Sequence, residues 1–269
     1  MSINKIRYIG VFALTIIFSI FPILNGGASS DNKAYGWGFK PGKPGQRPEV
    51  GQLYESILAR HNAFYIDKTT SKRLYLTFDA GYENGTTEHI LDVLKKHNVN
   101  ATFFLVGDYL KKEPELVKRM VNEGHIIGNH TWSHPDLTKL NKEQYQEELE
   151  KFEDYYKKLT GKNLLKIMRP PAGTFSERSL QIADELGYCN IFWSLAYKDW
   201  EIDKQRGWKY AYDEVMKRLH PGAIILLHPI SKDNALALEQ IIIDAKEQGY
   251  EFVPITTLFM PKIMFVNGF

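Results

Sequence analysis

The sequence contains a single cysteine, Cys189, among 269 residues. One cysteine cannot form a disulfide within the chain, and its apolar neighbours favour a buried, unreactive thiol over a nucleophile. The chain also lacks H-E-x-x-H, G-x-S-x-G and phosphate-loop motifs, and its glycines do not follow the G-x-G-x-x-G spacing. These absences leave zincin proteases, α/β-hydrolases and nucleotide-binding enzymes without support.

An excess of either charge is also missing. Residues 1–28 carry Lys5 and Arg7 and no acidic residue, and the rest of the chain has 32 basic and 32 acidic residues. A net charge near zero supplies no electrostatic field that would hold a polyanion. Nucleic acid is therefore not an expected partner.

A charged start, an apolar run and then small residues make up the N-terminus. Lys5 and Arg7 precede the apolar residues 9–24, and residues 26–29 are small. This order predicts a secretory signal peptide over residues 1–29, with an uncleaved membrane anchor as the alternative. The chain is therefore expected outside the cytoplasm, in contact with a membrane only through this segment if it is retained.

Residues 30–70 are rich in glycine and proline but also contain Trp37 and Phe39. Free linkers seldom carry such aromatics, so we expect an N-terminal arm that packs on the following domain. Within it, residues 51–66 are expected to include a short helix.

From Arg73 onward, short apolar runs alternate with amphipathic helical patterns. The predicted strands cover residues 73–79, 101–107, 125–130, 165–169, 190–195, 223–228 and 251–255. About seven strand–helix units predict a parallel sheet closed into a distorted (β/α)7 barrel over residues 71–262, with a doubly wound open sheet as the alternative. Asn141 with Gln144 predicts a capping box, and Asp233 or Asn234 is expected to cap the last long helix.

Polar side chains follow several of these strands, and a barrel would bring them to one rim. They are Asp79, His130, His134, Arg169, Asp199 and His228. Asp79 could instead cap the next helix or form an Asx-turn with Gly81. The other histidines do not lie in such motifs at the ends of predicted strands, and we expect them to be structural or solvated.

Each of these motifs has a chemical interpretation. Two imidazoles four residues apart, His130 and His134, suit a divalent metal, although a helix cap and a surface residue would give the same pattern. In Arg169-Pro-Pro-Ala172-Gly173 the prolines fix the turn, and the amides of the last two residues could face a ligand oxygen. A plain structural turn is the alternative.

The last two motifs lie later in the chain. Asp199 could orient a histidine or arginine, and Trp200 could form a sugar-stacking wall or belong to the core. His228 ends an apolar strand and could transfer protons if a carboxylate pairs with it.

Taken in order, these motifs resemble those of the NodB-homology polysaccharide deacetylases (carbohydrate esterase family 4). The resemblance covers about residues 73–259 and rests on five tracts: Thr77–Gly81, His130–His134, Arg169–Gly173, Asp199-Trp200 and Leu227-His228. It is nearest to the exported muramic-acid de-N-acetylases of endospore-forming bacteria. Those share the tract Phe78–Gly85, the arm Gly36–Phe39 and the stretch His228–Ala235.

The resemblance implies hydrolysis of an N-acetyl amide. By this resemblance Asp79 is the general base, His228 the general acid held by Asp199, and Arg169 orients Asp79. The Ala172 amide, with Gly173 beside it, would stabilise the oxyanion, Leu227 would line an acetate-sized pocket, and Trp200 would contact the sugar. The metal, zinc or another divalent ion, would be held by His130 and His134.

One departure from the family pattern concerns the metal. The family usually has a second aspartate as a metal ligand where this chain has Ala80. Alanine cannot bind a metal ion, so we expect weak binding through two histidines and water, or through another ligand such as Asn84 or Glu83.

The resemblance thus implies a deacetylase of N-acetylmuramic acid in peptidoglycan glycan strands, which we expect to act as a monomer. The resemblance adds muramic δ-lactam formation in the spore cortex and a forespore location. Two alternatives stay open: a deacetylase of N-acetylglucosamine in peptidoglycan or chitin-like oligomers, and a wall-binding module that has lost catalysis.

Overall fold

The computed structural model describes residues 31–258. The predicted signal peptide, residues 1–29, lies outside the described residues, as do the last residues of the predicted catalytic domain. Within residues 31–258 no helix is both long enough and apolar enough to cross a membrane.

A curled sheet of eight strands forms the centre of the molecule. The strands are β2 (Ala63–Phe64), β3 (Arg73–Ala80), β4 (Thr102–Leu105), β5 (Ile126–Asn129), β6 (Ile167–Met168), β8 (Cys189–Ile191), β9 (Ala223–Leu227) and β10 (Glu251–Phe252). Every pairing between them is parallel.

The order of the strands identifies the fold. Strands β3, β4, β5, β6 and β8 are neighbours in the order of the chain. A bridge between Leu195 and Ile225 then brings the segment after β8 back to β9, which pairs with β3. A doubly wound sheet would reverse its order at a switch point. The distorted barrel is therefore confirmed, and the open sheet is excluded.

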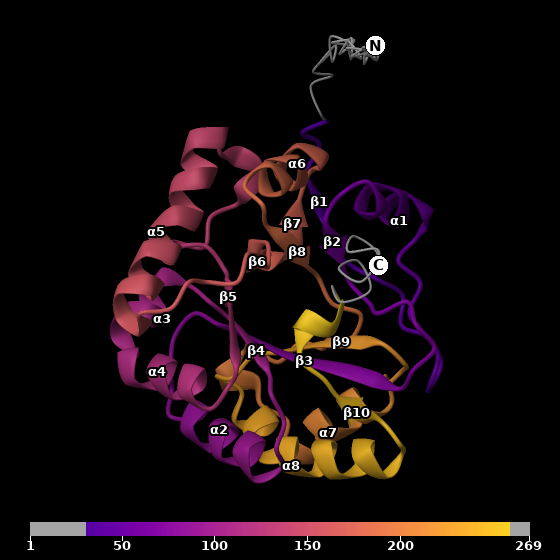
Figure 1. The fold of residues 1–269 in the computed structure, drawn as a ribbon. Helices are drawn as coiled ribbons and strands as arrows, with labels where there is room; N and C mark the ends of the chain where they lie inside the picture. The colour runs from indigo at the N-terminus through magenta and orange to yellow at the C-terminus, as the bar shows by residue number, and fades with distance from the viewer. Residues whose placement is uncertain (1–30, 259–269) are drawn as a thin grey trace, which may run out of the picture.

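Helices cover the outside of this sheet, as Figure 1 shows. They are α2 (Thr87–Lys96), α3 (Gly107–Lys112), α4 (Pro114–Asn122), α5 (Lys142–Thr160), α6 (Glu177–Glu185), α7 (Trp208–Met216) and α8 (Lys232–Glu247). The predicted capping box of Asn141 and Gln144 opens α5. The predicted cap of α8 was wrong: Ser231 accepts the hydrogen bond from the Asn234 backbone N–H.

Alternation along β3 divides the core into two layers. Leu74, Leu76 and Phe78 face the helices, whereas Tyr75 faces the inside of the curled sheet. Both faces of the strand are buried, the outer face under the helices and the inner face inside the curled sheet. Cys189 is buried in the inner layer, as its apolar neighbours predicted.

The N-terminal arm packs against the upper part of the sheet. Its strand β1 (Tyr35–Gly36) pairs with β7 (Thr174–Phe175), and helix α1 (Gln52–Ala59) follows. Only the first part of residues 51–66 is helical, because the chain then enters β2 beside β8. Trp37 is buried in an aromatic cluster with Phe175 and Phe192.

A buried histidine gives the fold a dependence on pH. The His125 Nδ1 accepts a hydrogen bond of 3.2 Å from the Ala101 N–H, and its Nε2 has no partner among the described residues. Burial lowers the pKa of His125 to about 4. The unfolded chain therefore takes up this proton first as the pH falls.

We expect His125 to reduce the free energy of unfolding between about pH 6.5 and 4, by at most about 3 kcal/mol. Above pH 6.5 the imidazole is neutral in both states, and this contribution to stability is fully present. Urea unfolding of the wild type and His125→Gln at several pH values measures the effect. An equally steep loss of stability in the variant over this range would contradict it.

Candidate active site

A buried ion pair lies at the centre of the candidate site. Asp79 is the last residue but one of β3 and is 8% exposed, while Arg169 follows β6 and is fully buried. The Arg169 Nη1 donates a hydrogen bond of 2.6 Å to the Asp79 Oδ1. The Arg169 Nε also donates to the Ile191 carbonyl at 2.9 Å, and the guanidinium lies over the Phe104 ring. Arg169 is thus held on several sides and fixes one oxygen of the Asp79 carboxylate.

The charges around Asp79 decide its protonation state. Burial acts to raise the pKa of Asp79, but the charges of Arg169 and His228 and the hydrogen bond from Arg169 outweigh it. The pKa of Asp79 therefore lies below its usual range, and the carboxylate is ionised at neutral pH. An ionised carboxylate with one oxygen not taken by Arg169 can accept a proton from water.

The two predicted metal ligands lie next to this carboxylate. The His130 Nδ1 is 2.8 Å from the Arg169 carbonyl oxygen, which can only accept, so Nδ1 carries the hydrogen. The bare Nε2 of His130 then faces the Asp79 Oδ2 at 3.7 Å. The His134 ring packs edge-on against His130, with ring centroids 4.8 Å apart. Burial lowers the pKa of His130 to about 4 and also lowers that of His134, so both imidazoles are neutral.

The protonation and the hydrogen bonds of these histidines show whether they could bind a metal ion. Neutral imidazoles are the form that binds metal ions, and a backbone carbonyl on the second ring nitrogen is the usual support of a ligating histidine. His130 meets both conditions. Among the described residues, however, no set of three or more histidine, cysteine or carboxylate side chains surrounds a possible ion. The described side chains therefore offer such an ion two imidazoles, and its remaining ligands would be water.

The other suggested ligands are engaged elsewhere. The Glu83 carboxylate accepts hydrogen bonds from the first backbone N–H groups before α2 and from the Tyr109 hydroxyl. The Asn84 Nδ2 donates to the Ile230 carbonyl, and its Oδ1 accepts from Thr86. These contacts bind the loop after β3 to the loop after β9, so neither side chain is placed as a metal ligand.

The turn after Arg169 is held in a special conformation. Ala172 lies in the left-handed region at φ 53°, and Gly173 follows at φ 65°. The Gly173 N–H donates to the Pro170 carbonyl at 3.0 Å, so the prediction that this amide could face a ligand was wrong. The exposed Ala172 stays the candidate for that contact.

The N-terminal arm supports this turn, which the sequence did not indicate. The Trp37 backbone N–H donates to the Gly173 carbonyl, and its indole Nε1 donates to the Trp193 carbonyl, both at 2.9 Å. A Cβ atom on Gly173 would lie 2.9 Å from the Trp37 Cβ and 2.8 Å from the Trp193 ring. The arm therefore fits tightly behind the turn that carries Ala172.

A histidine–aspartate pair forms the other side of the site. The His228 Nδ1 is 2.7 Å from the Asp199 Oδ1, and the His228 backbone N–H donates to the Asp199 Oδ2 at 2.8 Å. Burial acts to lower the pKa of His228, but the hydrogen bond and charge of Asp199, with the charge of Asp79, raise it above its usual value. The two halves of the site are close enough for the charge of His228 to act on Asp79.

Two predicted substrate contacts lie beside His228. The Trp200 side chain is 49% exposed, and its ring meets the His228 ring edge-on at 5.6 Å, so it belongs to the surface and not to the core. Leu227 is fully buried in the apolar cluster between sheet and helices. Its contact with a substrate acyl group stays a prediction.

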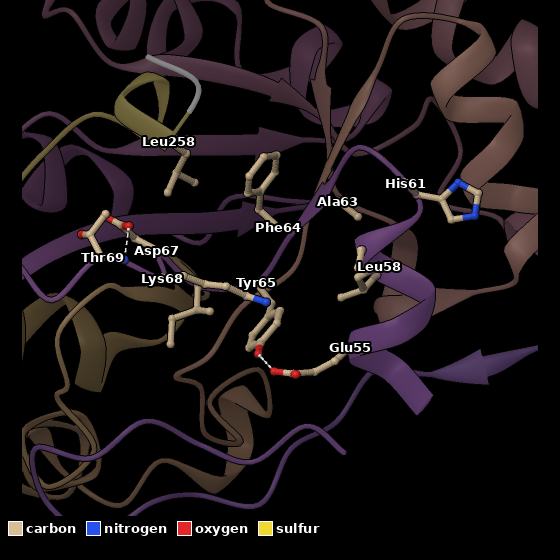
Figure 2. A pocket seen from close by; sticks show the side chains of 12 residues that line it. Glu55, Leu58, His61, Ala63, Phe64, Tyr65, Asp67, Lys68, Thr69 and Leu258 are labelled. Atoms are coloured by element: carbon tan, nitrogen blue, oxygen red, sulfur yellow. Dashed lines mark hydrogen bonds between the residues drawn. The ribbon is translucent and has the colours of Figure 1, made fainter. Parts of the chain in front are cut away.

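A separate hollow of about 500 Å³ lies between α1, β2 and Leu258. Figure 2 shows its wall, including Phe64, Tyr65 and the hydrogen bond from the Tyr65 hydroxyl to Glu55. None of the predicted site residues lines it. The carboxyl ends of the strands, and not this hollow, therefore carry the candidate chemistry.

Comparison with known proteins gives consistent matches. The family model described as polysaccharide deacetylase matches residues 66–191. The chain is 48% identical over 246 residues to a peptidoglycan-N-acetylmuramic acid deacetylase of Bacillus subtilis, covering 90% of this chain and 94% of that protein. A solved structure of that relative, a family 4 carbohydrate esterase, has a TM-score of 0.84 at 49% identity and covers 86% of this chain and 99% of its own. A peptidoglycan-N-acetylglucosamine deacetylase of Bacillus cereus is 39% identical over 188 residues, or 68% of this chain and 67% of that protein.

Proposed function

The chain belongs to the polysaccharide deacetylase family, and from this we propose that it is a hydrolase that removes the N-acetyl group from N-acetylmuramic acid in peptidoglycan. One observation carries the proposal: an ionised, buried Asp79 lies across one site from a His228 that is hydrogen-bonded to Asp199. A base and an acid on opposite sides of one site are what hydrolysis of an amide requires.

The residues perform the reaction as follows. Asp79 takes a proton from water through the oxygen that Arg169 leaves open, and the water oxygen attacks the acetyl carbon. The Ala172 N–H stabilises the oxyanion that forms. His228 gives its Nε2 proton to the sugar nitrogen as the carbon–nitrogen bond breaks, and Asp199 steadies the imidazole. The products are acetate and a free amino sugar.

His130 and His134 would hold a divalent ion beside Asp79. When bound, such an ion polarises the acetyl carbonyl and the attacking water. His130 itself keeps its bare Nε2 towards that place, because its Nδ1 is engaged by the Arg169 carbonyl.

We expect chelation to lower acetate release and added zinc or another divalent ion to restore it. His134→Ala should weaken binding of zinc, measured by calorimetry, because it removes one of only two protein ligands. His89→Ala is the matched control, since His89 is an exposed histidine on α2. Equal zinc binding by His134→Ala and the wild type would contradict this assignment.

We propose N-acetylmuramic acid as the substrate, and not N-acetylglucosamine, because the muramic-acid deacetylase matches this chain at higher identity and over more of its length. The glucosamine reading remains the second candidate. The proposal has three further parts. The enzyme is exported by a signal peptide, residues 1–29, that is then cleaved; it acts as a monomer; and it supports muramic δ-lactam formation in the spore cortex. A wall-binding module would have no use for the hydrogen-bonded base and acid.

Acetate release from three substrates tests the proposal: peptide-stripped peptidoglycan strands, intact peptidoglycan and chitin oligomers. Protein from residue 30 onward should release acetate from the stripped strands and much less from chitin oligomers. Release from chitin oligomers alone would favour the glucosamine enzyme. Binding of strands without any release, with every divalent ion tried, would favour the binding module.

A further inference from the structure

A chain of buried hydrogen bonds continues behind the His228–Asp199 pair. The Asn234 Nδ2 donates to the Asp199 Oδ2 at 2.5 Å and to the His228 carbonyl at 3.2 Å. The Tyr197 hydroxyl donates to the Asn234 Oδ1. Asn234 is only 1% exposed, so a fully buried side chain contacts the carboxylate that holds the imidazole.

The partners of Asn234 fix the direction of its amide. A carboxylate oxygen can only accept a hydrogen bond, so the nitrogen of the amide must face Asp199. The oxygen then faces the Tyr197 hydroxyl, which has a hydrogen to donate. The opposite orientation would place two oxygens against each other at Asp199.

Both oxygens of the Asp199 carboxylate therefore have hydrogen-bond partners. Oδ1 is paired with the His228 ring, and Oδ2 accepts from the His228 backbone N–H and from Asn234. A carboxylate whose two oxygens are both hydrogen-bonded to buried donors is held in one orientation. The proton therefore stays on the His228 Nδ1, and Nε2 stays directed towards the substrate.

The surrounding loop is anchored to the same helix turn. The Asp233 Oδ2 accepts from the backbone N–H groups of Arg206 and Gly207, both at 2.7 Å. The Ser231 hydroxyl donates to the Gln205 side chain at 2.8 Å. The start of α8 thus holds the segment that carries Tyr197, Asp199 and Trp200.

From this arrangement we propose that Asn234, supported by Tyr197, is a positioning residue of the deacetylase: it orients Asp199 and so sets the direction and the charge of the general acid His228. This inference rests on the proposed function for its kinetic consequence. Its electrostatic consequence is independent of catalysis. A helix-capping role alone would explain neither the contact with Asp199 nor the bond from Tyr197, since Ser231 already caps α8.

The variant Asn234→Asp distinguishes a role of Asn234 in positioning Asp199 from a role in holding helix α8 together. The side chain keeps its shape, and an acidic residue in the first turn suits a helix, so α8 should remain intact. A second carboxylate would however lie against Asp199, which should raise the pKa of His228 by about one unit or more. The other titratable groups near His228, namely Asp79, Arg169 and His134, are unchanged in this variant.

The titration of His228, followed by NMR of labelled imidazole, tests this without substrate. The signal is assigned by its loss in His228→Gln. We expect an upward shift in Asn234→Asp and a smaller shift in Tyr197→Phe. Asn141→Ala, which removes the cap of α5 and leaves this network intact, is the control and should lower the melting temperature without moving the titration.

Kinetics on stripped strands complete the test. Asn234→Asp and Asn234→Ala should lower kcat by about tenfold or more with little change in KM, and the alkaline limb of the rate profile should follow the shifted titration. An unmoved His228 titration in both Asn234→Asp and Tyr197→Phe would overturn the inference. If the wild type releases no acetate, the proposed function fails, and the titration still decides the role of Asn234.

Discussion

Replacing Asp79 by asparagine is expected to lower acetate release by about 10²–10⁴-fold, the usual contribution of a general base. The amide has nearly the same shape but cannot take the proton of the attacking water. The variant should also lose stability, by at most about 3–5 kcal/mol, because the buried Arg169 keeps its charge and loses its partner. Initial rates on stripped glycan strands and urea unfolding measure the two effects.

Asp92→Asn is the matched control for this experiment. Asp92 is an exposed aspartate on α2 that also pairs with an arginine, Arg119, at 2.5 Å. Exposed pairs contribute little to stability, so this variant should keep both its activity and its fold. An Asp79→Asn protein that remains folded and as active as the wild type would remove Asp79 from the role of base.

Replacing His228 by glutamine is expected to lower acetate release by a similar factor, about 10²–10⁴-fold. The leaving nitrogen then receives no proton from the protein as its bond to carbon breaks. In the wild type His228 must be protonated to act, and its pKa is raised, so activity should persist above the ordinary pKa of histidine and fall at alkaline pH. That alkaline limb should be absent in His228→Gln.

A histidine outside the site provides the comparison. His97 ends α2 and its Nε2 lies 2.8 Å from the Glu239 carboxylate, so it shares with His228 a carboxylate partner and nothing else of the site. His97→Gln should leave both the rate and the alkaline limb unchanged. Retention of the limb in His228→Gln would show that another group supplies the proton.

The fold could be predicted because its signals are local. The strands are short runs of mainly apolar residues, several of them followed by a polar residue, and the order of these runs along the chain is also their order in the sheet from β3 to β8. The strand ends then indicated Asp79, Arg169 and His228 as neighbours. Parallel strands bring their carboxyl ends to one side, so this inference needed no contact information.

Other parts of the site could not be predicted, because they depend on contacts between distant segments. Trp37 reaches the turn at Gly173 only after the arm has folded back over the sheet. Asp233 or Asn234 was expected to cap α8, whereas the loop after His228 turns so that Ser231 caps the helix and the Asn234 amide faces Asp199. The Gly173 N–H donates its hydrogen bond within its own turn, to the Pro170 carbonyl, and the residue types alone did not indicate this.

The central claim is that one site, with Asp79 as base and His228 as acid, removes acetyl groups from muramic acid. Mass spectrometry of disaccharides from peptide-stripped strands, after treatment with the wild type, tests it most directly. The account predicts free amines on the muramic acid residues and intact acetyl groups on the glucosamine residues. Free amines on glucosamine, with every muramic acid still acetylated, would contradict it.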